Sequence, residues 1–274
     1  MSKLKYILKE KRMLIALIAI LLICSIAIAI AVYAQVTNKG VKIPESEKVD
    51  VDYEELKNNF QDIFTNTINK EDTAKLNINY DELLYTRFNI KDEKNGKYTI
   101  EARLPGFKED SEVLQKINQE IFDIFAKEML RIGESATSYT TFNLDYVGYV
   151  NNNIISLAIM CKYKDGTKAQ RKIVKCYNYD IENDKLLSIE DIIEYKKLDK
   201  NKMQKKVNEE IKKINKQMKN ISDQGYNVFL REEESEIYKI ENTENFFLGR
   251  NNYLYLVYAY GNNNYTSEID LVIF

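Results

Sequence analysis

Residues 139–180, YTTFNLDYVGYVNNNIISLAIMCKYKDGTKAQRKIVKCYNYD, carry the clearest strand pattern of the chain. From Tyr139 to Tyr146 the side chains alternate between two faces, which is the period of a β-strand. Residues 153–163 and 168–180 follow as the arms of a hairpin that turns at Asp165-Gly166. The stretch therefore predicts a strand followed by a β-hairpin, and hence antiparallel pairing.

Upstream, the pattern predicts a helix, a pair of strands and a second helix. The strands are expected within residues 83–104, around a turn at residues 94–96, and Pro105-Gly106 is expected to end the second one. Either Asp110 or Ser111 can cap the second helix. The helices are recognised by apolar residues at helical spacing, which are Tyr53, Leu56, Phe60, Ile63 and Phe64 in the first and Leu114, Ile117, Ile121, Ile124, Phe125 and Leu130 in the second.

Downstream, two more helices precede the last strands. Ser188 is a predicted N-cap for a short helix over Ile189–Tyr195, and a charged helix follows it. That helix places Met203, Val207, Ile211, Ile214 and Met218 on one face, and the closing strands are Phe246–Leu248, Tyr253–Tyr260 and Ile269–Phe274. The order predicts an α+β fold with a largely antiparallel sheet and packed helices.

The N-terminal region has the pattern of a membrane anchor. Residues 13–34 carry no charge, and as a helix they would be about 33 Å long, which matches a hydrocarbon core of about 30 Å. The stub at residues 1–12 holds five basic residues against Glu10 alone, so we expect it to stay in the cytoplasm. Residues 35–50 are a predicted linker. We therefore expect a single-pass cell-membrane protein whose C-terminal domain is extracytoplasmic.

Two other interpretations of the apolar segment are open. Val32-Tyr33-Ala34 resembles a signal-peptidase site, which would make the segment a cleaved signal peptide. A lipoprotein signal needs a small residue before its cysteine, but Ile23 precedes Cys24. The remainder of the chain is exported in each case.

Composition excludes several kinds of chemistry. The chain has no histidine, which removes Ser-His-Asp and Cys-His catalysis and histidine metal sites. Outside the basic stub, 35 basic and 41 acidic residues remain, a balance of -6 that gives no electrostatic reason to bind nucleic acid. We expect no cofactor, no metal and no catalytic constellation.

The two cysteines of the predicted hairpin are expected to be free thiols. A two-residue turn would pair Cys161 with Gln170 and Cys176 with Ile155. The two sulfur atoms would then lie roughly 20 Å apart, which is too far for a disulfide. A longer turn would shift this register.

Several short strings resemble a family of exported bacterial domains, in which a domain of unknown function labelled DUF4163 precedes one labelled DUF3298. Such domains form the outer part of lysozyme-sensing anti-sigma factors of the RsiV type and occur in some peptidoglycan deacetylases. The resemblance covers roughly residues 80–274 and rests on Leu104–Phe107 before Ile117-Asn118, Tyr163–Thr167, Tyr177–Asp180, Lys185–Ile193, Phe246–Leu248 and Leu254–Tyr260.

The resemblance implies an outer location and two α+β lobes, DUF4163-like over residues 51–135 and DUF3298-like over residues 136–274. The chain departs from the family in three places. Only twelve residues precede the predicted span, where anti-sigma members carry a longer sigma-binding segment. The metal-binding histidines of the deacetylases are absent, and Ala169-Gln170 stands where members often have a histidine.

Tyrosine supplies the candidate binding residues, since the chain has 20 tyrosines in two strand-rich clusters. Tyrosine anchors partners at interfaces, although it is also a common strand residue. Acidic residues at 232–244 and the lysine-rich helix from Lys200 to Lys219 are more typical of solvated surfaces. The residues predicted to bind a ligand are Tyr146, Tyr149, Tyr258, Tyr260, Asn263 and Tyr265.

The predicted function is a non-catalytic binding or sensing module at the bacterial cell envelope. Its partner would be an envelope protein or a wall glycan. Two other functions stay open: a carboxylate-dependent cell-wall hydrolase, and an accessory subunit of a membrane complex.

Overall fold

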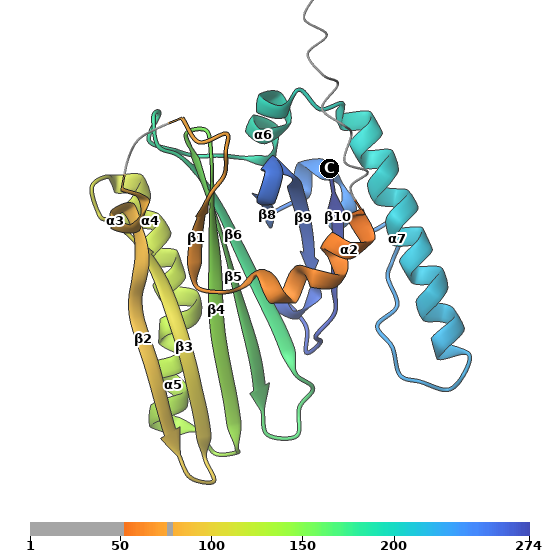
Figure 1. The fold of residues 1–274 in the computed structure, drawn as a ribbon. Helices are drawn as coiled ribbons and strands as arrows, with labels where there is room; N and C mark the ends of the chain where they lie inside the picture. The colour runs from red at the N-terminus through yellow and green to blue at the C-terminus, as the bar shows by residue number, and fades with distance from the viewer. Residues whose placement is uncertain (1–51, 76–78) are drawn as a thin grey trace, which may run out of the picture. The chain divides into compact units, whose positions relative to one another are not determined.

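The structure is a computed structural model that describes residues 52–75 and 79–274 (Figure 1). The predicted stub, membrane span and linker lie outside these residues. Among the described residues, none of the helices combines the length and apolar character that crossing a membrane requires. Residues from Tyr53 to Phe274 form one compact unit.

A seven-stranded sheet dominates this unit, in the order β2-β3-β4-β5-β6-β7, with β1 added beside β4. β1 and β3 both pair with β4 in parallel, along different parts of its length, and all other pairs are antiparallel. Strands from both predicted lobes share this sheet. The strands are β1 (Thr67–Lys70), β2 (Leu84–Lys94), β3 (Tyr98–Phe107), β4 (Thr140–Asn151), β5 (Ile154–Asp165), β6 (Arg171–Asp180) and β7 (Lys185–Leu186).

The last part of the chain forms a second, three-stranded antiparallel sheet in the order β10-β9-β8. Its strands are β8 (Phe246–Leu248), β9 (Leu254–Ala259) and β10 (Ile269–Ile273). The two sheets and their helices confirm the predicted α+β class with largely antiparallel pairing.

The helices begin where the sequence offers caps. Ser111 accepts the backbone N–H of Leu114, and Ser188 forms a capping box with Asp191. The helices are α2 (Tyr53–Asn58), α3 (Tyr80–Leu83), α4 (Glu112–Ile121), α5 (Lys127–Ser135), α6 (Ile189–Lys196) and α7 (Lys200–Ser222), with 3₁₀ turns η1 (Asn59–Ile63), η3 (Glu236–Tyr238), η4 (Ile240–Asn242), η5 (Arg250–Asn252) and η6 (Tyr260–Asn262).

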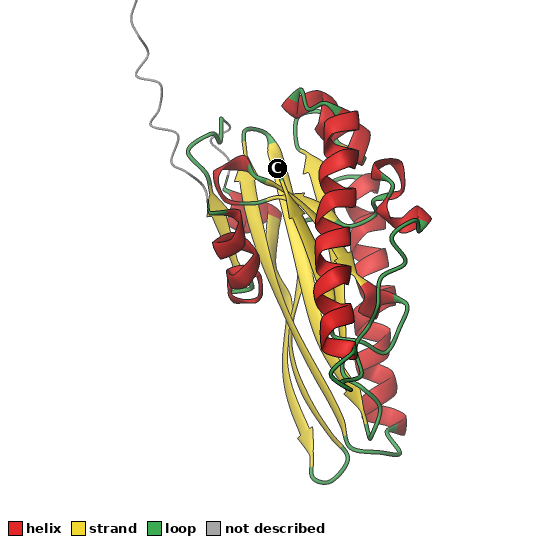
Figure 2. Ribbon diagram, turned by 90° about the vertical axis from the view of Figure 1, so that its right-hand side faces the viewer, coloured by secondary structure: helices red, strands yellow, loops and turns green. Residues whose placement is uncertain are grey.

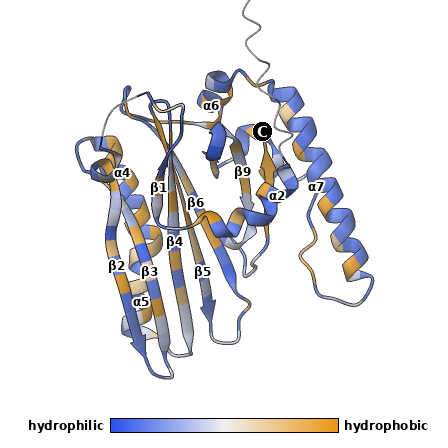
Figure 3. Ribbon diagram, in the orientation of Figure 1, coloured by the Kyte–Doolittle hydropathy of each residue, from blue (hydrophilic) through white to orange (hydrophobic). Residues whose placement is uncertain are grey.

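Three apolar cores join these elements in layers. One core packs α4 and α5 on one face of the large sheet, and a second packs the small sheet on the opposite face. The third lies between the outer face of the small sheet and the helices α6 and α7. Helices flank the strands on both sides (Figure 2), and the outward side of α7 is mostly hydrophilic (Figure 3).

Two predicted details are wrong. Leu130 is exposed, because in a regular helix it lies about 160° around the axis from Leu114, whereas Met129 and Ile132 lie on the buried side. Between these residues, Phe122–Ala126 (η2) form a π-helical turn. β3 continues through Pro105 to Phe107, opposite a bulge in β2, where a strand tolerates proline.

The hairpin register also differs from the predicted one. β6 begins only at Arg171, so the turn is longer, and Cys161 pairs with Ile173 while Cys176 pairs with Ala158. The two cysteines belong to cores on opposite faces of the sheet. Both are free and buried, as expected.

Candidate functional site

A cavity of about 730 Å³ lies between β6, β9 and the segment 229–245. We call it the β6–β9 cavity. It exists because β8 is only three residues long and pairs with β9 no further than Leu256. The residues before β8 form the turns η3 and η4 rather than a longer strand, so β8 covers β9 no further.

The backbone of β9 shows which groups point toward β10 and which point the other way. Leu254 and Phe274 exchange two hydrogen bonds of 2.9 Å, and the N–H of Tyr260 donates to Glu268. Backbone hydrogen bonds to one neighbouring strand recur at every second residue. The N–H and C=O groups of the even-numbered residues of β9 therefore point toward β10. Val257 faces the other way and donates to the carbonyl of Asn245 at 2.8 Å. Ala259 lies past the end of β8, where it is the N-cap of the 3₁₀ turn η6, and it lines the cavity.

Two uncharged polar atoms behind the cavity wall have no hydrogen-bond partner. They are the hydroxyl of Tyr258 and the side-chain oxygen of Asn245, on residues that are 6% and 7% exposed. Thr243 is the polar neighbour of Tyr258, and its hydroxyl donates to the backbone carbonyl of Lys239 at 3.4 Å. Burial raises the pKa of Tyr258 above its ordinary value. Such orphaned groups are rare in proteins, because each one costs about 1–3 kcal/mol.

The edge of β6 on the other side of the cavity is closed by the loop after β9. The side-chain amide of Asn262 donates to the carbonyl of Val174 and accepts its N–H, both at 2.9 Å. Gly261 makes this approach possible, because a Cβ atom there would lie 2.2 Å from the carbonyl oxygen of Lys172. The side chain of Asn262 therefore takes the place of a neighbouring strand.

A buried ion pair fixes the segment that covers the cavity. Arg231 donates to both carboxylate oxygens of Asp270, at 2.9 and 2.7 Å, and its outer nitrogen also reaches Glu268 at 3.0 Å. The hydroxyl of Tyr260 donates to Asp270 at 2.6 Å and lies 2.6 Å from that of Tyr238. Burial and the charge of Asp270 raise the pKa of Tyr260, and burial raises that of Tyr238 to about 12.

Two of the charged groups that line the cavity, Glu128 and Arg171, have partners within the protein, and Glu232 and Glu244 line it as well. Both carboxylate oxygens of Glu128 accept from Arg131, at 2.9 and 2.6 Å, and this hydrogen bonding lowers the pKa of Glu128. Arg171 donates to the backbone carbonyls of Gly261 and Asn262. Within residues 52–75 and 79–274, no three acidic or cysteine side chains are grouped as metal ligands.

The structure brings three of the six predicted residues together, since Tyr258, Tyr260 and Asn263 all line the cavity. Tyr146 and Tyr149 lie on β4, away from it and in different cores. The remaining residue, Tyr265, is 54% exposed, beside Lys168 and Arg171.

The two residues on β4 make internal contacts. The hydroxyl of Tyr146 lies 2.8 Å from that of Thr86, and the ring of Tyr149 stacks on Phe247. Burial raises the pKa of Tyr149 to about 12.

Sequence reasoning missed Asn245, Ala259, Arg231 and Asp270. A signal existed for Asp270, because it is the single charge in the apolar strand IDLVIF. Arg231 stands among acidic residues and gave no sign of burial. Asn245 and Ala259 matter through their positions beside the end of β8, which no local pattern marks.

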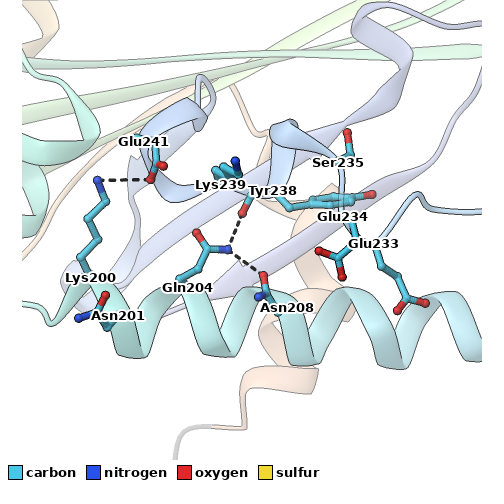
Figure 4. Close-up of a pocket in the computed structure, with 10 residues that line it drawn as sticks. All are labelled: Lys200, Asn201, Gln204, Asn208, Glu233, Glu234, Ser235, Tyr238, Lys239 and Glu241. Atoms are coloured by element: carbon cyan, nitrogen blue, oxygen red, sulfur yellow. Dashed lines mark hydrogen bonds and ion pairs between the residues drawn. The ribbon is translucent and has the colours of Figure 1, made fainter.

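A smaller cavity of about 340 Å³ lies between α7 and residues 233–241 (Figure 4). Gln204 donates to the carbonyl of Tyr238 at 2.9 Å and accepts the N–H of Ile240 at 3.0 Å. Lys200 forms an ion pair with Glu241 at 3.4 Å. These contacts hold the turns η3 and η4 against α7, so they explain the polar lining without a ligand.

Comparisons with known proteins give structural neighbours only. No family model matches the chain, and no curated protein matches it. The chain is similar to the crystal structure of a DUF3298 family protein from Pseudomonas aeruginosa PAO1, at 14% identity and a TM-score of 0.40, covering 66% of this chain and 83% of that one. A DUF3298 family member from Bacteroides fragilis NCTC 9343 is similar at 12% identity and a TM-score of 0.29, covering 59% and 74%. Both of these solved structures are DUF3298 family proteins, and both resemble this chain at low identity.

Proposed function

We propose that this chain is a membrane-anchored, extracytoplasmic binding module of the bacterial cell envelope, and that it holds its partner in the β6–β9 cavity. The observation that carries the binding role is the set of unpaired polar groups at that cavity, the Tyr258 hydroxyl and the Asn245 oxygen. A partner that reaches them recovers hydrogen bonds that the free protein lacks. The predicted basic stub and apolar span support the location.

Binding fits the cavity better than hydrolysis. A carboxylate-dependent hydrolase needs an acidic side chain that is free to exchange a proton with its substrate. Of the three acidic side chains that line the cavity, Glu128 is held by Arg131 through both oxygens, so a hydrolase would have to use Glu232 or Glu244. The orphaned polar groups point to binding instead. We also propose that the chain is divided as the sequence resemblance implies, into a DUF4163-like part over residues 51–135 and a DUF3298-like part over residues 136–274.

Location is tested with a reporter fused after Phe274 in cells that express the full chain. A reporter that is active only outside the cytoplasm should be active, because the basic stub holds the N-terminus inside. Activity of a cytoplasmic reporter at the same position would refute the location.

Binding is tested by passing purified wall fragments and envelope proteins over the immobilised full chain in detergent at low salt. A bound component should be lost when Asn263→Trp fills the mouth of the cavity. Gln217→Trp adds the same side chain on the exposed surface of α7 and should leave binding unchanged. Retention of no component, or equal retention by both variants, would refute binding at this cavity.

A further inference from the structure

We propose that the outward face of α7 lies against the membrane that anchors the chain and binds the anionic headgroups of its lipids. The binding surface is the α7 lysine row, which consists of Lys202, Lys205, Lys212, Lys216 and Lys219. This inference rests on the membrane location proposed above and concerns a surface apart from the β6–β9 cavity. It depends on the alignment of the lysines, the position of the acidic residues around them, and the point where the described chain begins.

The five lysines form a straight row on the side of α7 that faces away from the protein. Since each residue turns a helix by about 100°, they fall within about 100° of arc and extend over about 25 Å of its length. Met203, Val207 and Ile211 are buried on the opposite side. All five lysines are exposed, and the outward side of α7 is mostly hydrophilic (Figure 3). The row therefore presents five ammonium groups in one direction.

The positive charge of the row is largely uncompensated. Over its whole length α7 has eight lysines and two glutamates, a net charge of +6. Glu209 is the one acidic residue of α7 within the arc of the row, and it lies 3.8 Å from Lys205. The other four lysines of the row have no ion-pair partner within residues 52–75 and 79–274. Exposed helices usually alternate charges of both signs, and this face does not.

The acidic residues that pack against α7 lie on its two flanks. On one flank is the segment 233–241, where Glu233 accepts a hydrogen bond from Asn215 at 2.7 Å. On the other flank Lys213 forms an ion pair with Glu54 at 3.2 Å. Asn215 and Lys213 lie about 90° and about 70° around the helix from the middle of the row. Both contacts are therefore at the sides of the row, which leaves its lysines facing solvent.

The start of the described chain favours a membrane as the partner. The ammonium of Lys206 on α7 lies 4.4 Å from the ring centre of Tyr53, and two ion pairs join α2 to α7. α2 therefore rests on α7, and the chain before it leaves the compact unit beside this helix. The predicted linker at residues 35–50 spans at most about 55 Å when fully extended. A membrane that holds residues 13–34 is thus always within reach of the α7 lysine row.

The shape of the row also fits a flat surface. A straight row on the convex side of a helix meets a plane with all five side chains, whereas it offers a flexible polymer no groove. Each lysine close to an anionic lipid surface strengthens attachment by up to about fivefold. Five lysines on a domain that is already tethered are therefore enough to hold α7 at the surface.

The test uses the full chain, with Cys24→Ser, in vesicles of phosphatidylcholine alone or mixed with phosphatidylglycerol. A fluorophore on Asn220→Cys, within the arc of the row, reports the approach of lipids that carry a quencher in the headgroup, while Cys161 and Cys176 are buried. Quenching should be at least about twofold greater in the anionic vesicles, and the difference should vanish in 1 M salt, where the Debye length is about 3 Å. A fluorophore on Asn95→Cys, in the β2–β3 turn far from α7 (Figure 1), should show no difference.

Replacing four lysines of the row with glutamine should abolish the difference between the two kinds of vesicle, because these lysines supply most of the attachment. The row variant is Lys202→Gln, Lys212→Gln, Lys216→Gln and Lys219→Gln. A control variant makes the same change of charge at four exposed lysines away from α7, which also lack an ion-pair partner in the described part of the chain, and it should keep the difference. These are Lys94→Gln, Lys97→Gln, Lys116→Gln and Lys164→Gln.

Equal quenching in both kinds of vesicle, an unchanged difference in the row variant, or its loss in the control variant would each overturn the inference. If a soluble glycerol-phosphate polymer bound the row while anionic vesicles gave no difference, the partner would be a wall polymer and not the membrane. Both leaflets of these vesicles have the same lipids, so the result does not depend on the orientation that the reporter at Phe274 tests. It is equally independent of the cavity that Asn263→Trp fills.

Discussion

Removing the guanidinium of Arg231 should destabilise the fold more than any surface charge removal. The side chains of Arg231 and Asp270 are 1% and 4% exposed, and Arg231→Met leaves the carboxylate of Asp270 buried without its cation. Loss of one partner of a buried pair costs about 3–5 kcal/mol. Tyr260 still donates to Asp270 in this variant, so the loss should lie toward the lower end of that range. A domain of this size has a total stability of about 5–15 kcal/mol.

The measurement is urea unfolding of residues 48–274, followed by circular dichroism. Arg87→Met is the control. The ion pair of Arg87 with Glu109 has a nitrogen–oxygen distance of 2.8 Å, close to the 2.7 Å between Arg231 and Asp270, but its side chains are 36% and 49% exposed. It should cost less than about 1 kcal/mol. The double variant Arg231→Met with Asp270→Leu should recover at least about 2 kcal/mol relative to Arg231→Met, since it no longer buries a lone charge.

These measurements distinguish the cost of an unpaired buried carboxylate from the cost of lost packing contacts. If Arg231→Met cost no more than Arg87→Met, the ion pair would not fix the segment over the cavity. If the double variant were less stable than Arg231→Met, lost contacts rather than the unpaired carboxylate would explain the effect.

Three further predictions concern the loop after β9, the tyrosines and the thiols. Gly261→Ala should lower the midpoint of thermal unfolding markedly, because its Cβ would overlap the backbone of Lys172. Gly96→Ala should lower it less, because no atom lies within 4 Å of the new Cβ and the only cost is the strain of an alanine at positive φ. Stability should fall as pH rises from about 10 to about 12, because unfolded tyrosines ionise first while burial keeps the folded ones neutral. Part of the tyrosinate absorbance should therefore appear in one step together with unfolding, and unfolding without such a step would contradict this. The tyrosines whose pKa burial raises to about 12 are Tyr149, Tyr163, Tyr179 and Tyr238. Cys161 and Cys176, whose pKa burial also raises, should react with a thiol reagent only in denaturant, and fast reaction of either in the folded protein would show that it is accessible.

Local patterns predicted the elements that depend on neighbours in sequence. The alternation before Tyr146 became β4, and the arms of the hairpin became β5 and β6. Ser188 and Asp191 form the predicted helix start, because a capping box needs only residues three apart. Prediction failed at Leu130, which is exposed because it lies about 160° from Leu114 around a regular helix and so is not part of the apolar stripe.

Binary patterning also predicted which residues are buried, but not which of them meet. Tyr258 and Tyr260 were predicted candidates because of their type, and the structure places them at one cavity while Tyr146 and Tyr149 lie elsewhere. The cavity itself depends on how far β8 extends along β9, which is a relation between separate segments.

The sequence by itself determined the order and class of the elements and the pattern of a membrane anchor, since each follows from the period, charge or spacing of nearby residues. Tertiary structure alone decided that Arg231 meets Asp270, that Asn262 closes the edge of β6, and that Ala259 is left beside an open space. Those contacts join residues far apart in the chain. They are set by packing of whole layers against one another, and no local preference encodes which distant partner a side chain will reach.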